Sequence, residues 1–270
     1  MSARRVIAGF LFAVSACLPS FAARASDAAV TAWQQDQALL RQTVADVQAG
    51  GILALKSHVP ALEQALDGAQ LVWYGKDNTI VLTDGLAETI AATAALANDK
   101  THKTQHVDAM ESPYQTMSLF LGSYYDEIGR PQDALRVLDK GLALSALPGV
   151  NLGAHRPYLV CERGAALNGL KRWNDALANY DDGLKAGNAP ALVRAIMYRG
   201  RGFDLTELNR LDEAKAAYEE SLKLDPGNSV ALHELAYIAG LKAGEPKAPP
   251  ALKSVQKQSK GDGTGAPAKP

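Results

Sequence analysis

Two histidines four residues apart come closest to a metal-binding pattern in this chain. His102 and His106 are followed by Asp108 and Glu111, and two imidazoles at this spacing on a helix could bind one zinc ion. The segment around them has little apolar periodicity, so it offers no rigid scaffold for a site. We therefore interpret residues 98–111 as a polar linker, and we expect no metal site and no cofactor.

Other patterns that support catalysis are missing from the sequence. There is no glycine-rich phosphate loop, no nucleophile elbow and no cysteine pair with metal-ligand spacing. His58, His155 and His233 are isolated, and we expect them at the surface or in packing roles. The alternative is an enzyme with its site in residues 26–112, but this segment is short and lacks a clustered nucleophile and base. We expect a protein that is not an enzyme.

The two cysteines do not predict an internal disulfide. Cys17 lies near the N-terminus, and Cys161 is the other one. Cys161 falls within an expected helix with no histidine or lysine beside it to lower the pKa of its thiol. We interpret it as a small apolar residue.

Three stretches share one arrangement of small and large residues. In each, a glycine is followed by a large apolar or aromatic residue at +3, an alanine at +12 and a second large residue at +16. Glycine inside a helix costs about 1 kcal/mol relative to alanine, so its recurrence indicates that another helix must approach closely there. The pattern predicts helical pairs that bury their apolar faces by stacking on each other. The three sets are Gly122, Tyr125, Ala134 and Leu138; Gly164, Leu167, Ala176 and Tyr180; and Gly202, Leu205, Ala214 and Tyr218.

These stretches resemble the tetratricopeptide repeat family, which places small and aromatic residues at such positions and often ends a unit with proline. The third stretch is the best match, with Tyr198 and a closing Leu224-Asp225-Pro226. The glycines of the first and second stretches are 42 residues apart, and those of the second and third are 38 apart. The family's usual period is 34 residues, so we expect longer loops between these repeats. The resemblance covers residues 113–244, and it implies a non-catalytic module that binds other proteins.

The sequence therefore predicts a mainly α protein, a short α-solenoid of helix-turn-helix repeats with an N-terminal helical segment that carries a small β-hairpin. Polar residues between two β-rich runs place the hairpin near residues 70–83. The predicted regions are a signal peptide (1–25), the N-terminal segment (26–112), three repeats with a capping helix (113–244) and a disordered tail (245–270).

The N-terminal residues indicate export. Arg4 and Arg5 precede an apolar run, and Ala23-Arg24-Ala25 resembles a cleavage site. We expect a periplasmic protein, or otherwise a secreted one. The alternative is an outer-membrane lipoprotein, because Val14-Ser15-Ala16-Cys17 resembles a lipobox in which Cys17 receives a lipid anchor. We expect no membrane span.

The charge distribution argues against a nucleic-acid partner. Residues 1–25 carry three arginines and no acidic residue, so the remainder has a net charge of −4. The tail carries five lysines against Glu245 and Asp262, which leaves about −7 on the part between. A protein or peptide partner fits this charge better than a polyanion does.

The family resemblance implies that the first helix of each repeat lines a concave groove. Positions at i, i+3, i+7 and i+10 of each first helix share one face. The lysine and asparagine pattern that grips a carboxylate in some family members is missing, because Leu119, Ser123 and Gly200 occupy those places. We expect the partner-binding residues to be Asp126, Tyr158, Asn168, Arg199 and Phe203.

Overall fold

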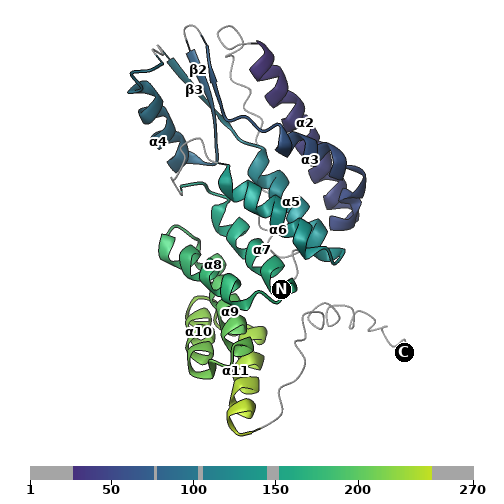
Figure 1. The fold of residues 1–270 in the computed structure, drawn as a ribbon, viewed down its shortest axis with the longest axis vertical. Helices are drawn as coiled ribbons and strands as arrows, with labels where there is room; N and C mark the ends of the chain where they lie inside the picture. Colours follow the sequence, from purple (N-terminus) through teal and green to yellow (C-terminus); the bar gives the residue numbers. More distant parts are fainter. Residues whose placement is uncertain (1–26, 76–77, 103–105, 145–151, 245–270) are drawn as a thin grey trace, which may run out of the picture.

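The computed structural model describes residues 27–75, 78–102, 106–144 and 152–244. The predicted fold class is confirmed: helices dominate, and a small sheet lies in the N-terminal half (Figure 1). The predicted signal peptide with Cys17 and the predicted tail lie outside the described residues, so their assignments stay predictions. The elements are α2 (Asp27–Gly50), the 3-10 helix η1 (Ile52–Ser57), α3 (Val59–Asp67), β1 (Val72–Tyr74), β2 (Asn78–Thr83), α4 (Leu86–Ala97), β3 (His106–Glu111), α5 (Tyr114–Glu127), α6 (Pro131–Ala143), α7 (Arg156–Gly169), α8 (Trp173–Ala186), α9 (Ala191–Glu207), α10 (Leu211–Leu224) and α11 (Ser229–Lys242).

The helices from α5 onward form successive pairs. We call α5, α7 and α9 the inner helices and α6, α8 and α10 the outer helices. Each inner helix packs against the outer helix that follows it, and α7 also packs against both α5 and α9. Prolines at the first turns of α6 and α7 fix the helical φ angle where these helices begin. The pairs continue to α11, which packs on α10 at the far end of the stack (Figure 1).

The predicted hairpin is confirmed, but it belongs to a larger sheet. β1 pairs antiparallel with β2, with Val72 opposite Val81. β3 pairs parallel with the other edge of β2, and α4 connects β2 to β3. The prediction that residues 98–111 form only a linker is therefore wrong for residues 106–111. A hairpin alone is marginally stable, and here a third strand and the buried side chains of Ala92 and Leu96 from α4 complete its core.

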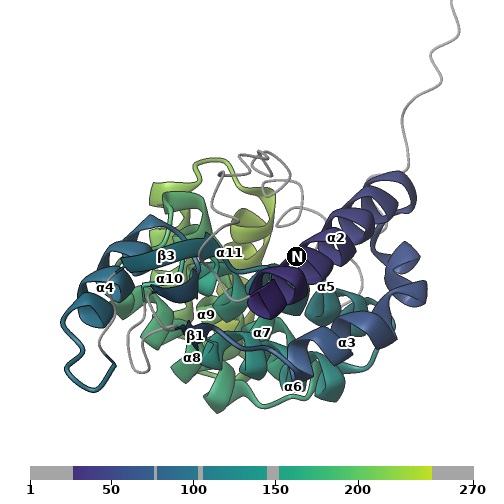
Figure 2. The same cartoon turned by 90° about the horizontal axis from the view of Figure 1, so that it is seen from above.

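The N-terminal helices are fixed to the first repeat by polar contacts as well as by the shared core. The Tyr114 hydroxyl donates to Asp36 at 2.9 Å, and the Tyr125 hydroxyl donates to Glu63 at 2.9 Å. Figure 2 shows α2 and α3 on one side of the stack and α4 with the sheet on the other. Within the described part of the chain, none of the helices is both long and apolar enough to cross a membrane.

Candidate functional site

Glycine on an inner helix allows the following outer helix to approach closely. A Cβ atom added at Gly122 would lie 2.6 Å from Cδ2 of Leu138, and one added at Gly202 would lie 2.7 Å from Cε2 of Tyr218. Both distances are shorter than non-bonded carbon atoms tolerate. The prediction that these glycines mark helix contacts is confirmed.

Tyr180 on α8 sets the spacing between two successive pairs. A Cβ atom at Gly164 on α7 would lie 2.2 Å from Cζ of Tyr180, and one at Gly200 on α9 would lie 2.3 Å from the same atom. The tyrosine is only 4% exposed. Its ring therefore lies between two inner helices, and both must carry glycine where they face it.

Three of the five predicted contact residues reach the solvent. Asp126 is exposed in the last turn of α5, and Tyr158 and Phe203 are half-buried on α7 and α9. Phe203 packs edge-to-face against Trp173, with ring centroids 5.6 Å apart. We call the side of α5, α7 and α9 that carries these three residues the inner face. It offers aromatic side chains and a carboxylate from three successive helices.

The other two predicted contact residues are buried. Arg199 is 5% exposed, and its Nη1 donates to Oγ of Ser221 at 3.0 Å and to Oδ2 of Asp225 at 3.1 Å. This placement gives Arg199 a structural role between α9 and the end of α10, which the sequence did not indicate. Asn168 is 6% exposed, and its Oδ1 has no hydrogen-bond partner among the described residues.

Two buried carboxyl groups near the inner face escaped sequence reasoning. Burial raises the pKa of Glu162 on α7 to about 7 and that of Asp204 on α9 to about 8. The Ser123 hydroxyl donates to Oε2 of Glu162 at 3.1 Å, and a hydrogen bond from the Asn168 side chain partly offsets the effect of burial on the pKa of Asp204. Glu162 and Asp204 each directly follow a position that we expect to line the groove, so their closeness to the inner face is the signal that the sequence offers for them.

Cys161 is a buried free thiol on α7. Burial raises its pKa, so the reactive thiolate form is rare at neutral pH. The interpretation as a small apolar residue agrees with this placement, although Cys161 is more deeply buried than the half-buried position that we expect from the sequence.

Comparison with known proteins agrees with this geometry. Residues 195–228 match the family model described as tetratricopeptide repeat. This segment covers the contact between Gly202 and Tyr218. Residues 195–228 are therefore similar to one tetratricopeptide repeat.

Solved tetratricopeptide repeat domains are also similar to about half of this chain. One is the first such domain of Spaghetti (RPAP3) bound to the HSP90 peptide SRMEEVD, which is 25% identical, with a TM-score of 0.42 over 50% of this chain and 97% of that one. Another is the first domain of human RPAP3, which is 26% identical, with a TM-score of 0.41 over 48% of this chain and 95% of that one. A search of the curated proteins found no match.

The histidines considered for metal binding have other partners. His102 stacks on Tyr74, with ring centroids 3.8 Å apart, and lies 3.1 Å from Oδ2 of Asp99. His106 lies on β3 and is 3.0 Å from Oδ1 of Asp108. Among the described residues, no group of three or more histidine, cysteine, aspartate or glutamate side chains could hold a metal ion.

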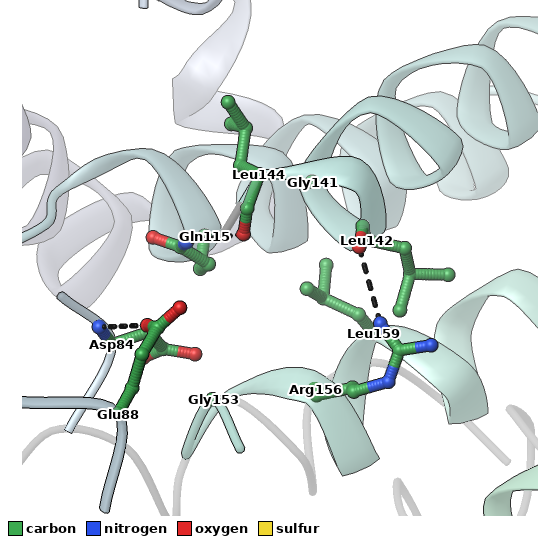
Figure 3. Close-up of a pocket in the computed structure, with 9 residues that line it drawn as sticks. All are labelled: Asp84, Glu88, Gln115, Gly141, Leu142, Leu144, Gly153, Arg156 and Leu159. Carbon is green, nitrogen blue, oxygen red and sulfur yellow. Dashed lines mark hydrogen bonds between the residues drawn. The ribbon is translucent and has the colours of Figure 1, made fainter. Parts of the chain in front are cut away.

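A small cavity lies where α5, α6 and the start of α7 meet the connection from β2 to α4 (Figure 3). Its volume is about 20 Å³, which is room for roughly one water molecule. It is therefore too small for an organic ligand. Its lining residues are Asp84, Glu88, Gln115, Gly141, Leu142, Leu144, Gly153, Arg156 and Leu159.

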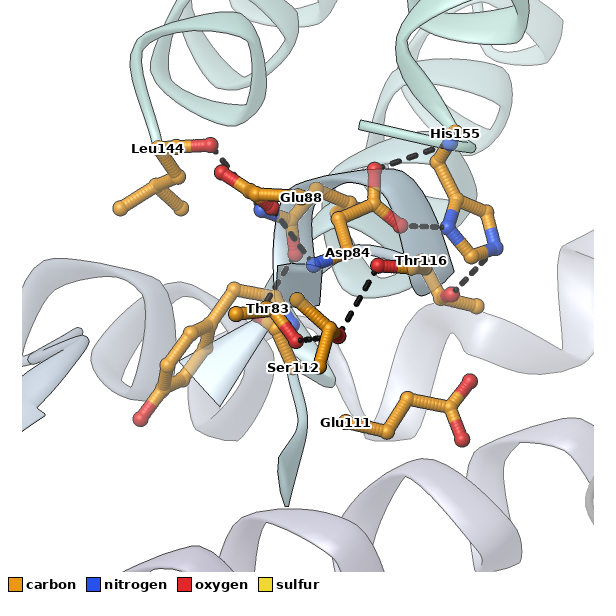
Figure 4. A network of polar contacts seen from close by, with 12 residues as sticks. Thr83, Asp84, Glu88, Glu111, Ser112, Thr116, Leu144 and His155 are labelled. Carbon is orange, nitrogen blue, oxygen red and sulfur yellow. Dashed lines mark hydrogen bonds and ion pairs between the residues drawn. The ribbon is translucent and has the colours of Figure 1, made fainter. Parts of the chain in front are cut away.

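A polar network beside this cavity joins a carboxylate, a histidine and a hydroxyl group in the order that these groups have in the catalytic triads of hydrolases (Figure 4). Asp84 bonds the Nδ1 side of His155, and the His155 Nε2 atom lies 3.3 Å from Oγ1 of Thr116. Asp84 also accepts the backbone N–H of His155 at 2.9 Å, and its own carbonyl accepts the N–H of Ala154 at 2.7 Å. Since His155 directly precedes α7, these bonds cap that helix and hold the sheet against it. We therefore interpret the network as a structural contact that fixes the sheet to α7.

Proposed function

We propose that this chain is a non-catalytic module that binds a segment of another protein on its inner face. The observation that carries the proposal is the placement of Asp126, Tyr158 and Phe203 on three successive inner helices, each accessible to solvent. Half-buried aromatic side chains on a rigid scaffold are typical anchors of protein interfaces. Tetratricopeptide repeat domains among the similar structures bind peptides, and we extend this class of activity to the present chain.

Site-specific photo-crosslinking tests this proposal. A photoreactive phenylalanine analogue placed at Tyr158 or at Phe203 should link a partner polypeptide in the native host. The matched control carries the same analogue at Ala216, which is exposed on the outer helix α10. Equal cross-linking from α10 and from the inner face would refute the proposal.

We further propose that the module acts in the bacterial cell envelope, after export to the periplasm. The basic start, the apolar run and the small residues before Ser26 support this location. The mass of the mature N-terminus tests it. An unmodified start at Ser26 in the soluble fraction supports a free periplasmic module, whereas a diacylglyceryl group on Cys17 supports the lipoprotein alternative, and an unprocessed Met1 would contradict both.

A further inference from the structure

The strand β3 forms an open edge of the sheet. The strand order is β1-β2-β3, so β2 is paired on both sides, whereas β1 and β3 each have one side without a strand among the described residues (Figure 1). An edge strand presents a row of backbone N–H and C=O groups to whatever lies beside it. β1 is only three residues long, and the Gln70 amide already donates to its Val72 carbonyl at 2.9 Å. β3, with six residues, is therefore the longer open edge.

The register shows which backbone groups of β3 point away from β2. Successive residues of a strand direct their N–H and C=O groups to opposite sides, so every second residue faces the same neighbour. The N–H of Ser112, directly after β3, donates to the Thr83 carbonyl of β2 at 2.9 Å. The even-numbered residues of β3 therefore face β2, and the odd-numbered residues Val107, Ala109 and Glu111 face the open side.

Two side chains of α2 agree with this orientation and show what the open side requires. Trp33 Nε1 donates to the Glu111 carbonyl at 2.9 Å, and Gln37 Nε2 donates to the same oxygen at 3.1 Å. At this end of the edge, side chains thus supply the donors that a further strand would supply. Within the described part of the chain, no hydrogen bond uses the N–H or C=O groups of Val107 or Ala109. Ala109 is exposed, so a second polypeptide can reach these groups.

We propose that β3 binds an extended segment of a partner polypeptide, which adds a fourth strand to the sheet. The segment would pair with the N–H and C=O groups of Val107 and Ala109, and it would end where Trp33 and Gln37 occupy the last carbonyl of the edge. Main-chain hydrogen bonds of this kind give affinity for an extended polypeptide, and side chains on alternate residues give specificity. The edge is separate from the inner face, so this inference does not depend on the function proposed there.

The charge of β3 favours a basic segment. Glu111 is exposed and forms no ion pair among the described residues. A lysine or arginine opposite Ala109 would lie diagonally beside Glu111, within reach of a long side chain. The segment therefore carries a basic residue, and it has no proline where it pairs with Val107 and Ala109, since proline lacks the N–H that the ladder needs.

A second copy of the chain fits this edge less well. Two β3 strands paired antiparallel about Asp108 would place identical carboxylates opposite each other, which is unfavourable. Pairing about Ala109 would require the Glu111 carbonyl as an acceptor, and Trp33 and Gln37 already use both of its lone pairs. The observations therefore favour a different polypeptide as the occupant.

Amide hydrogen exchange of the full chain, measured for each residue by NMR, tests whether the edge is open. The amides of Val107 and Ala109 should exchange at least about tenfold faster than those of Asp108 and Met110, which face β2. Equal protection of all four at every protein concentration would mean that another part of the chain covers the edge. Protection of Val107 and Ala109 only at high concentration would mean that a second copy binds there, and either result would overturn the proposal.

Fluorescence anisotropy with model peptides tests the occupant. The first probe is a fluorescein-labelled eight-residue peptide that alternates threonine with valine and has one central lysine, and the second probe has glutamate in place of this lysine. The lysine peptide should bind about fivefold or more tightly than the glutamate peptide, and it should slow exchange at Val107 and Ala109. Glu111→Gln should remove the preference. Equal affinity of the two probes for the unaltered chain would overturn the proposed basic segment.

Ala109→Pro removes one outward N–H and keeps the hydrogen bonds between β2 and β3, because an edge strand tolerates proline where its N–H faces solvent. This variant should weaken the lysine peptide about tenfold or more. The matched control is Ala109→Val, which keeps the N–H and should leave the affinity unchanged, as should Tyr158→Ala with Phe203→Ala on the inner face.

Three results would overturn the inference: no binding of the lysine peptide, full affinity in Ala109→Pro, or binding that leaves exchange at Val107 and Ala109 unchanged. If Ala109→Pro itself speeds exchange throughout β2, the variant disturbs the sheet. Protection of Val107 and Ala109 by the lysine peptide in the unaltered chain then decides the question.

Discussion

Gly164→Ala tests the packing of the repeats most directly. The added Cβ would lie 2.2 Å from Cζ and 2.3 Å from the hydroxyl oxygen of Tyr180. The ring has no space to retreat, because Gly200 of the next inner helix lies just as close to it. Either α7 and α9 must separate or Tyr180 must leave its buried position.

The expected loss of stability follows from two opposing effects. Adding a methyl group to a well-packed core costs about 1–3 kcal/mol. Because the Tyr180 ring is confined on both sides, we expect Gly164→Ala to cost an amount near the upper end of this range. Alanine regains about 1 kcal/mol of helix propensity over glycine. The net loss should be about 2 kcal/mol, which lowers the melting temperature of a chain of this size by roughly 4–8 °C.

Urea unfolding followed by circular dichroism measures this loss, and hydrogen exchange locates it in α7 to α9. Gly68→Ala is the control, since its Cβ would lie 3.5 Å from the nearest atom and should be tolerated. The double variant Gly164→Ala, Tyr180→Leu should lose less stability than the sum of its single changes, because the two changes relieve the same contact. An unchanged or raised melting temperature for Gly164→Ala would refute this account of the packing.

Three further predictions concern buried polar groups. Arg199→Ala should cost about 2 kcal/mol in urea unfolding, because it removes a buried donor to Ser221 and leaves Asp225 with the Asn228 amide alone. Arg201→Ala removes a more exposed pair with Asp181 and should cost less than about 1 kcal/mol. Equal losses would contradict the structural role of Arg199. The raised pKa values of Glu162 (about 7) and Asp204 (about 8) mean that the folded state binds more protons than the unfolded state, so these two groups should lower stability as pH rises from about 4 to 8. Asp204→Asn should therefore raise the urea midpoint at pH 8.5 more than at pH 6, and an equal effect at both would refute the raised pKa. Asp84→Ala should loosen the sheet from α7, seen as faster hydrogen exchange in β2 and α4 but not in α10; uniform protection would mean that the network does not hold the sheet.

The repeat architecture could be predicted because its packing rule recurs in the sequence. Gly122, Gly164 and Gly202 each face a large side chain sixteen residues later, and the same contact forms in all three pairs. Because this pairing of a glycine with a large side chain recurs at a fixed spacing, it can be recognised in the sequence without knowledge of long-range contacts. The hairpin was also predictable, since both of its strands are local in sequence.

The third strand was not predictable in the same way. β3 pairs with β2 across the whole of α4, so its partner is far away in the sequence. Its residues His106 and Asp108 are polar, and the Asn78 amide on β2 donates to Oδ2 of Asp108 at 2.9 Å across the two strands. A polar edge strand with a distant partner carries too weak a local pattern to be distinguished from a linker.

The buried carboxyl groups were missed for a related reason. Glu162 and Asp204 lie on amphipathic helices, where an acidic residue is normally placed towards solvent. Only the stacking of successive inner helices buries them. Arg199 shows the converse error, because a residue type typical of interfaces was expected at the surface and is used within a repeat instead.

Basic and acidic side chains of the inner helices differ in their partners. Two basic side chains of the inner helices form ion pairs with outer helices, namely Arg163 with Asp139 and Arg201 with Asp181. Glu162 and Asp204 have no ion-pair partner among the described residues, and burial of a carboxyl group without such a partner lowers stability when the group is ionised. A neutral side chain at Asp204 would pack more favourably, so stability alone gives no reason for the carboxylate.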